Sequence, residues 1–239
     1  SIIINGGYVE ANAYDDAINA SNYIQINDGF VWAYARGNDA IDCNGAENNS
    51  SGGGGMPGGG TSSTIITIEI NGGTIIASGT EVAVDDCGDR GGYIKAQNCT
   101  MVLIGGSMGV TEATPQLTGQ KAITISSSGG GNPWGGGGSS GGLTTAQNGF
   151  IVKNSSGNEI MTFKWPTIST GQSGFEDTTA GAKPGNSSGI YITTPDVQTG
   201  SYTYWTSPTI SGGTSWHGLY DLGSATVTTS GNGSSATAQ

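Results

Sequence analysis

Three segments in the first third of the chain share one pattern: Asn5–Val9 (NGGYV), Asn27–Val31 (NDGFV) and Asn71–Ile75 (NGGTI). Each places Asn and Gly, which favour turns, directly before the start of a short apolar run. The first two copies begin 22 residues apart. A period of this length, with short strands between the turns, is typical of proteins whose repeats bury their apolar faces against one another.

A second, acidic element follows each copy of this pattern, at Asp15–Asn19, Asn38–Asp42 and Glu81–Asp85. The two elements together predict an all-β fold in which residues 1–126 form the rungs of a right-handed parallel β-helix (a solenoid), with a Gly-rich insertion at residues 46–63. Equivalent side chains would then stack between rungs, and the three asparagines that open the repeats would form a ladder of amides.

The remaining sequence lacks this repeat. Residues 127–142 are a Gly-rich loop, and we expect residues 143–239 to form a C-terminal antiparallel β-module packed on the helix. A hairpin is indicated where Gly149–Lys153 and Ile160–Lys164 flank the turn-forming residues 154–158. Further strands are indicated at Tyr191–Thr193 and Ser201–Trp205.

The composition suggests a secreted protein at or outside the cell surface. The chain has 45 glycines, only 10% charged residues and a formal net charge of -11. Its 7 Lys and Arg residues form no basic patch, which argues against binding to nucleic acid or to an anionic membrane. No apolar run has the length of a transmembrane helix, so we expect no membrane insertion. Because Ser1 begins directly in strand-type sequence, we expect a mature or trimmed chain.

The order of these parts resembles a known family. The repeat INGG(T/Y)(V/I)…DDAI(N/D) precedes SSGNEIMTFKWP (residues 155–166), ITTPDVQTGSYTYWT (residues 192–206) and a final SGG. This order is similar to that of the secreted "carbohydrate-binding domain-containing" β-helix proteins of clostridia and Bacteroidetes. The resemblance implies a right-handed β-helix that binds calcium and acidic polysaccharide, without known catalysis.

The acidic turns predict a calcium site independently of that resemblance. Carboxylates stacked at rung spacing repel one another unless a cation lies between them, and calcium accepts six to eight oxygens in flexible geometry. The alternative is a solvated acidic edge in which Asp serves only to form turns. The candidate ligands are Asp15, Asp16, Asp39, Asp42, Asp85, Asp86 and Asp89.

An enzyme, such as a polysaccharide lyase with Arg36, Arg90 or Lys95 beside bound calcium, is a weaker alternative. The acids recur with the repeat, so a structural role explains them better than a catalytic pair does. The only histidine, His217, is expected to be a packed or capping residue. We therefore expect a non-enzymatic protein.

Aromatic residues supply the candidate carbohydrate site. Trp32 and Tyr34 alternate with small residues and could share one exposed face, on which sugar rings would stack, and Trp134 is a third candidate. Tyr8 and Phe30 match in the repeat and should stack on successive rungs. The alternative for all of these rings is packing in the core or between modules.

Two further sets of residues carry predictions. Cys43 and Cys87 occupy matching positions and predict a disulfide, which leaves Cys99 as a thiol. If the source glycosylates its proteins, seven sequons are candidates: Asn19, Asn48, Asn49, Asn98, Asn154, Asn186 and Asn232.

Two functions follow from these patterns. The first is a non-catalytic surface or matrix protein that associates with a polysaccharide or other glycan through a calcium-stabilised β-helix. The second is a structural subunit of an extracellular filament, because the apolar strand Ile2, Ile3 and Ile4 has no cap before it and would pair with another copy of the chain.

Overall fold

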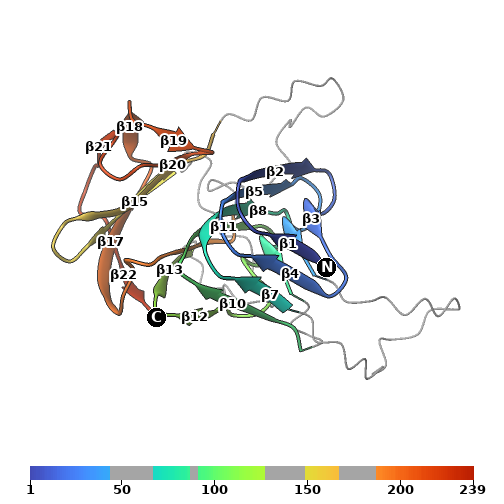
Figure 1. Cartoon of the computed structure of the whole chain (residues 1–239). Coiled ribbons are helices and arrows are strands. Elements are labelled where there is room, and N and C mark those ends of the chain that lie inside the picture. The colour runs from blue at the N-terminus through green and yellow to red at the C-terminus, as the bar shows by residue number, and fades with distance from the viewer. Residues whose placement is uncertain (44–66, 87–90, 127–148, 167–186) are drawn as a thin grey trace, which may run out of the picture.

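The computed structural model describes residues 1–43, 67–86, 91–126, 149–166 and 187–239 (Figure 1). These residues form strands and turns, with no helix among them. In the described part of the chain, therefore, no helix is long and apolar enough to cross a membrane. The Gly-rich segments at 46–63 and 127–142 lie outside the described residues.

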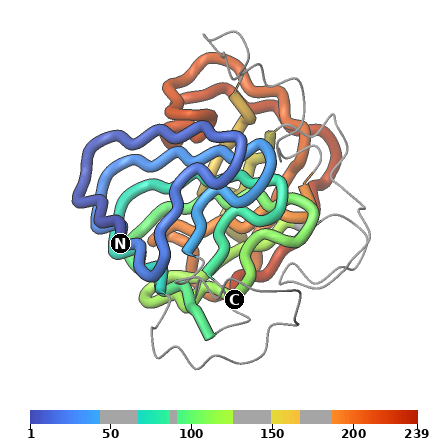
Figure 2. The backbone as a smooth tube through the Cα atoms, turned by 90° about the vertical axis from the view of Figure 1, so that its right-hand side faces the viewer, coloured from blue at the N-terminus to red at the C-terminus, as the bar shows by residue number. Residues whose placement is uncertain are grey.

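The repeats form two wholly parallel sheets. Sheet 1 has five strands in the order β1-β4-β7-β10-β12, and sheet 3 has three strands in the order β3-β6-β9. Each strand pairs with its equivalent from the next repeat, so that the turns of the chain lie one behind the next (Figure 2). The strands are β1 (Ile2–Ile4), β4 (Tyr23–Ile26), β7 (Thr67–Ile70), β10 (Tyr93–Gln97), β12 (Gln116–Thr118), β3 (Ile18–Asn19), β6 (Ile41–Asp42) and β9 (Val84–Asp85).

Sheet 2 has six strands in the order β13-β16-β11-β8-β5-β2 and mixes both kinds of pairing. Its repeat strands are parallel, whereas β16 lies between β11 and β13 and is antiparallel to both. All six residues of β16 are buried, as befits a strand covered on both faces. The strands are β2 (Tyr8–Ala13), β5 (Phe30–Ala35), β8 (Gly73–Ser78), β11 (Cys99–Gly105), β13 (Lys121–Ser126) and β16 (Gly189–Thr194).

Sheet 4 is antiparallel and has the order β19-β20-β15-β14-β17-β22. The predicted hairpin forms β14 and β15, with Phe150 opposite Phe163, and a small sheet of β18 and β21 lies beside it (Figure 1). The strands are β14 (Gly149–Asn154), β15 (Glu159–Lys164), β17 (Gly200–Thr206), β18 (Thr209–Ser211), β19 (Ser215–Trp216), β20 (Leu219–Tyr220), β21 (Thr226–Thr228) and β22 (Ser234–Ala238).

Two apolar cores stabilise this arrangement. The inner core lies between sheets 1, 2 and 3, where Ile24, Ile68 and Ile94 stand in register and are almost wholly buried. The second core lies between the outer face of sheet 2 and sheet 4, and it contains Ile192 of β16 and Phe163 of β15. Alternation along β5, β8 and β11 of sheet 2 therefore supplies residues to both cores at once.

The amide ladder predicted from the repeats is confirmed. Asn27 Nδ2 donates to Asn5 Oδ1 at 2.8 Å, and Asn71 Nδ2 donates to Asn27 Oδ1 at 3.0 Å. The glycine that follows in the repeat is required by geometry: Gly29 has a φ of 98°, and a Cβ there would lie 2.6 Å from the carbonyl oxygen of Gly7.

The predicted right-handed parallel β-helix with an antiparallel C-terminal module packed on it is wrong. Sheet 2 mixes parallel and antiparallel strands, and sheet 4 is antiparallel throughout. Strand β16 belongs by sequence to the predicted module 143–239 but pairs within the sheet of residues 1–126. The error has a physical cause: the strand predicted at Tyr191–Thr193 was assigned to the C-terminal module, whereas every residue of β16 is buried, as in a strand covered on both faces.

Candidate functional site

Sheet 3 carries a column of polar side chains that we call the acidic edge: Asp16, Asp39, Asp42, Asp85, Asp86 and Glu112. Parallel register places Asn19 beside Asp42 and Asp42 beside Asp85. A bridge between Val84 and Thr111 brings Glu112 next along the same column. The repeat thus gathers acids that are far apart in sequence.

Three carboxylates of the edge accept hydrogen bonds from backbone amides of the following turn. Asp16 Oδ1 accepts from Asp39 N at 3.3 Å, Asp39 Oδ1 from Val82 N at 2.8 Å and Asp86 Oδ1 from Ala113 N at 3.2 Å. These bonds hold one turn against the next. A role of these aspartates in forming turns, the alternative to calcium binding, therefore accounts for part of their function.

Burial disfavours the charged form of two carboxyls of the acidic edge, Asp39 and Asp42, and so raises their pKa values. Desolvation, with smaller contributions from the carboxylates of Asp85, Glu81 and Asp16, raises the pKa of Asp39 to about 7 despite the opposing hydrogen bond from Val82 N. Desolvation likewise raises the pKa of Asp42 to about 9, with a contribution from its hydrogen bond to Asp16. Asn19 Nδ2 donates to both Asp16 Oδ2 and Asp42 Oδ2, at 2.6 and 2.8 Å.

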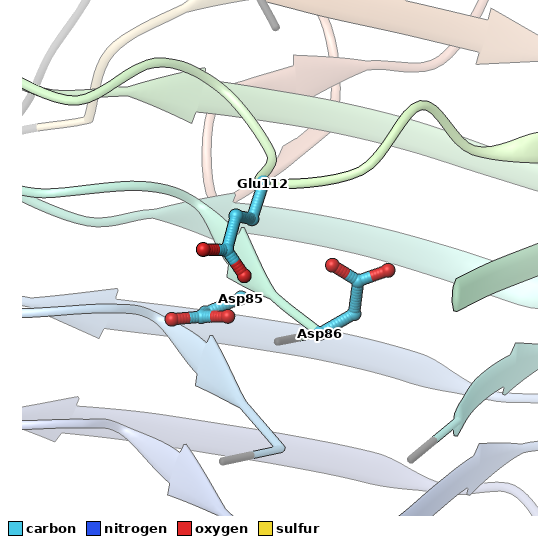
Figure 3. Close-up of side chains that lie close together, drawn as sticks. All are labelled: Asp85, Asp86 and Glu112. Carbon is cyan, nitrogen blue, oxygen red and sulfur yellow. The ribbon is translucent and has the colours of Figure 1, made fainter. Parts of the chain in front are cut away.

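The part of the edge that could hold a metal ion consists of Asp85, Asp86 and Glu112. Each offers a carboxylate oxygen, and these oxygens lie within 4.8 Å of one another. In Figure 3 the Glu112 carboxylate points toward Asp85, and Asp86, the next residue after Asp85 in the chain, stands beside them. Three carboxylates at this separation suit a hard cation with oxygen ligands.

The predicted ligands fall into distinct groups. Asp85 and Asp86 lie in this cluster, Asp16, Asp39 and Asp42 lie beside one another further along the edge, Asp15 is exposed to solvent, and Asp89 lies outside the described residues. Glu112 was missed because its turn, Val110–Glu112, lacks the Asp-Asp pair. Its signal was a β-branched residue, Thr111, directly followed by an acid, as at Val84 and Asp85.

A second feature is an exposed group of rings that we call the aromatic shelf: Tyr8, Phe30 and Trp216. Tyr8 and Phe30 stack as the repeat predicts, with ring centroids 5.0 Å apart and planes inclined by 8°. Trp216 of β19 meets Phe30 edge-on at 5.3 Å. Tyr8 is 71% exposed and Phe30 37%, so both side chains reach solvent.

Trp32 and Tyr34, the predicted carbohydrate residues, are instead buried, with 6% and 1% of their surfaces exposed. They share the outer face of β5 with Phe30, but sheet 4 packs over that face. Trp32 stacks on His217 at 4.4 Å, and Tyr34 meets Trp165 edge-on at 5.6 Å. The exposed row predicted there is therefore wrong, while Trp134 lies outside the described residues.

His217 joins the two halves of the chain. It lies in the turn between β19 and β20 with a φ of 44°, and its Nε2 is 2.7 Å from Glu10 Oε1 on β2. The same ring stacks on Trp32. This is a packed histidine, as the sequence predicts, and it holds Trp216 beside Phe30.

A groove of about 260 Å³ opens beside the shelf. Phe30 and Trp216 belong to both, so the shelf forms one wall of the groove. Hydroxyls of Thr74 and Thr100 line it, as do the exposed residues Asp196 and Asp221. No Lys, Arg or His is among its lining residues in the described part of the chain.

The cysteines do not form the predicted pair. Cys43 and Cys99 are free and buried, and burial raises their pKa values to about 11 and about 12, so both are held as thiols. Cys87 lies outside the described residues.

Two of the basic residues considered for a lyase make contacts with neighbouring repeat residues. Arg36 Nε donates to Ala13 O, and the Lys95 ammonium lies over the Tyr93 ring at 4.6 Å. Arg90 lies outside the described residues.

The sequons differ in accessibility. The amide of Asn19 is engaged in the acidic edge, and Asn154 Oδ1 accepts two backbone bonds in the hairpin turn. Asn98, with a φ of 49°, and Asn232 are exposed. Asn48, Asn49 and Asn186 lie outside the described residues.

Comparison of the chain with models of protein families, with curated proteins and with solved structures gave no match.

Proposed function

We propose that this chain is a non-catalytic carbohydrate-binding protein that acts outside the cell, with its sugar site on the aromatic shelf. The observation that carries the proposal is the solvent-exposed stack of Tyr8 and Phe30, bordered by Trp216. A soluble protein gains stability by burying such rings, so their exposure beside a groove marks a binding surface. The family resemblance of the sequence supports the same class of ligand.

The shelf suits a sugar ring because its faces are flat, apolar and bordered by hydroxyls. The axial C–H groups of a pyranose pack on aromatic faces, while its hydroxyls require polar partners. Thr74, Thr100 and Tyr220 in the adjoining groove provide such partners.

Binding to insoluble polysaccharides tests this proposal. Tyr8→Ala and Trp216→Ala should each weaken retention by about tenfold, because each removes one stacking face. Tyr14→Ala is the matched control, because Tyr14 is 76% exposed and is not part of the shelf. Equal loss in the control, or retention by the two shelf variants as strong as that of the native chain, would contradict the proposal.

The same proposal assigns calcium to Asp85, Asp86 and Glu112. The support is that three carboxylates lie close together, next to the buried carboxyls of Asp39 and Asp42, whose pKa values are raised. A divalent cation between the carboxylates would relieve the repulsion among their negative charges. Calcium tolerates irregular oxygen geometry better than magnesium does.

Thermal unfolding tests the calcium assignment. Calcium at about a hundred times its dissociation constant should stabilise the chain by about 2.7 kcal/mol, and Glu112→Gln should remove most of this gain. Asp15→Asn removes an exposed carboxylate elsewhere and should leave the gain unchanged. An equal calcium response in all three proteins would place the ion elsewhere.

A second candidate function, a filament subunit, rests on one observation. Among the described residues β1, β2 and β3 are the terminal strands of their sheets, so three strand edges stand at the same end of the chain. Open edges are templates for pairing, and Ile3 on β1 is 56% exposed. Ile2 packs against the inner core and Ile4 is buried, so only Ile3 of the predicted assembly residues faces solvent.

Sedimentation velocity in calcium and then in excess chelator tests assembly. Large species that vanish in Ile3→Lys would support strand pairing at this edge. A monomer under both conditions would eliminate the filament function and leave carbohydrate binding untouched.

A further inference from the structure

The charge of the groove beside the aromatic shelf indicates which class of glycan it accepts. Asp196 and Asp221 line the groove with exposed carboxylates. None of its lining residues in the described part of the chain is Lys, Arg or His. A polyanionic ligand would meet repulsion here without a compensating cation.

The field of the whole chain acts in the same direction. The formal net charge is -11, with 18 acidic against 7 basic residues. A cleft lined by one sign of charge concentrates ligands of the opposite sign. The groove therefore favours a cationic ligand over a neutral one, and a neutral ligand over an anionic one.

The aromatic shelf adds a second attraction for cations. Phe30 and Trp216 line the groove, and the faces of their rings are electron-rich. An ammonium group near a ring face is attracted by the ring quadrupole, and the neighbouring carboxylates can pair with the same group. Rings and carboxylates together suit a sugar that carries a protonated amine.

We propose that the groove between Phe30, Trp216, Asp196 and Asp221 binds a glycan of amino sugars with free, protonated amino groups. The sugar rings pack on Phe30 and Trp216, and the ammonium groups lie toward Asp196 and Asp221. This inference rests on the proposed carbohydrate function and names the ligand class of the same site.

Isothermal titration at mildly acidic pH, where the sugar amine is charged, separates the relevant ligands. The probes are an oligomer of glucosamine, its fully N-acetylated counterpart of equal length and an oligomer of galacturonic acid. N-acetylation keeps the ring and the length but removes the charge. We expect the glucosamine oligomer to bind most tightly and the galacturonate oligomer most weakly.

The double variant Asp196→Asn and Asp221→Asn should weaken binding of the glucosamine oligomer by about three- to tenfold and leave the acetylated oligomer unaffected. The matched control, Asp15→Asn with Asp28→Asn, changes the net charge equally at exposed positions outside the groove. This control should bind the glucosamine oligomer with nearly the affinity of the native chain. A similar loss of affinity in both double variants would show that net charge, and not ion pairs with Asp196 and Asp221, determines binding.

The outcomes for the inference and for the proposed function differ. If the acetylated or acidic oligomer binds as tightly as the glucosamine oligomer and Trp216→Ala still weakens binding, the amine preference is wrong and the carbohydrate site stands. If none of the three oligomers binds the native chain, the amine preference is overturned, and the carbohydrate site is overturned with it when the insoluble polysaccharides do not retain the chain either.

Discussion

The buried carboxyls of the acidic edge make the stability of this chain fall as pH rises. In the folded chain desolvation raises the pKa of Asp39 from its ordinary 3.8 to about 7 and that of Asp42 to about 9. A carboxyl with a raised folded pKa binds its proton more tightly in the folded state than in the unfolded state. Its stabilising effect is therefore complete below pH 3.8 and is lost as pH rises toward 7 for Asp39 and toward 9 for Asp42.

The magnitude follows from the size of the shift. One pKa unit corresponds to about 1.4 kcal/mol, so the rise at Asp39 alone is worth about 4 kcal/mol at most. Water at the edge and local rearrangement relieve part of this cost. For both groups together we expect the free energy of unfolding to fall by about 3 kcal/mol between about pH 5 and pH 8.

Urea denaturation in excess chelator at a series of pH values measures this directly. The double variant Asp39→Asn and Asp42→Asn should show a much flatter profile, because asparagine keeps an acceptor for Val82 N but has no charge to bury. Asp15→Asn with Asp28→Asn is the control for net charge. A native profile that is flat or rises over this range would refute the argument from desolvation.

Three further substitutions test the packing. Asn27→Ala breaks the amide ladder on both sides and should lower the free energy of unfolding by about 1–2 kcal/mol, as measured by urea denaturation. An unchanged free energy of unfolding would mean that the ladder bonds are no more favourable than bonds of the same amides to water. Gly29→Ala sets a Cβ against the Gly7 carbonyl at positive φ and should cost about 1–3 kcal/mol, whereas a neutral result would show that this turn readjusts freely. Phe163→Ala should cost about 3–5 kcal/mol, because its ring is wholly buried in the second core. A loss below about 1 kcal/mol would show that sheet 4 adds little to stability.

Local patterns in the sequence determined the repeat strands. Asn5 and Asn27 open equivalent turns and do stack, and the residues that follow them, including Tyr8 and Phe30, lie in parallel register. These contacts join equivalent positions of neighbouring repeats, so the repeat predicts them. The hairpin of β14 and β15 was likewise readable, because its turn is local in the chain.

The tertiary structure alone decided the remaining contacts. The alternating pattern predicts that Phe30, Trp32 and Tyr34 share one face of their strand. It does not predict that sheet 4 covers Trp32 and Tyr34 but leaves Phe30 exposed at the margin of the contact. Nor could it place β16 inside sheet 2 or bring Trp216 to Phe30. These contacts join residues far apart in sequence with no shared period, and their positions depend on which faces gain most by mutual burial.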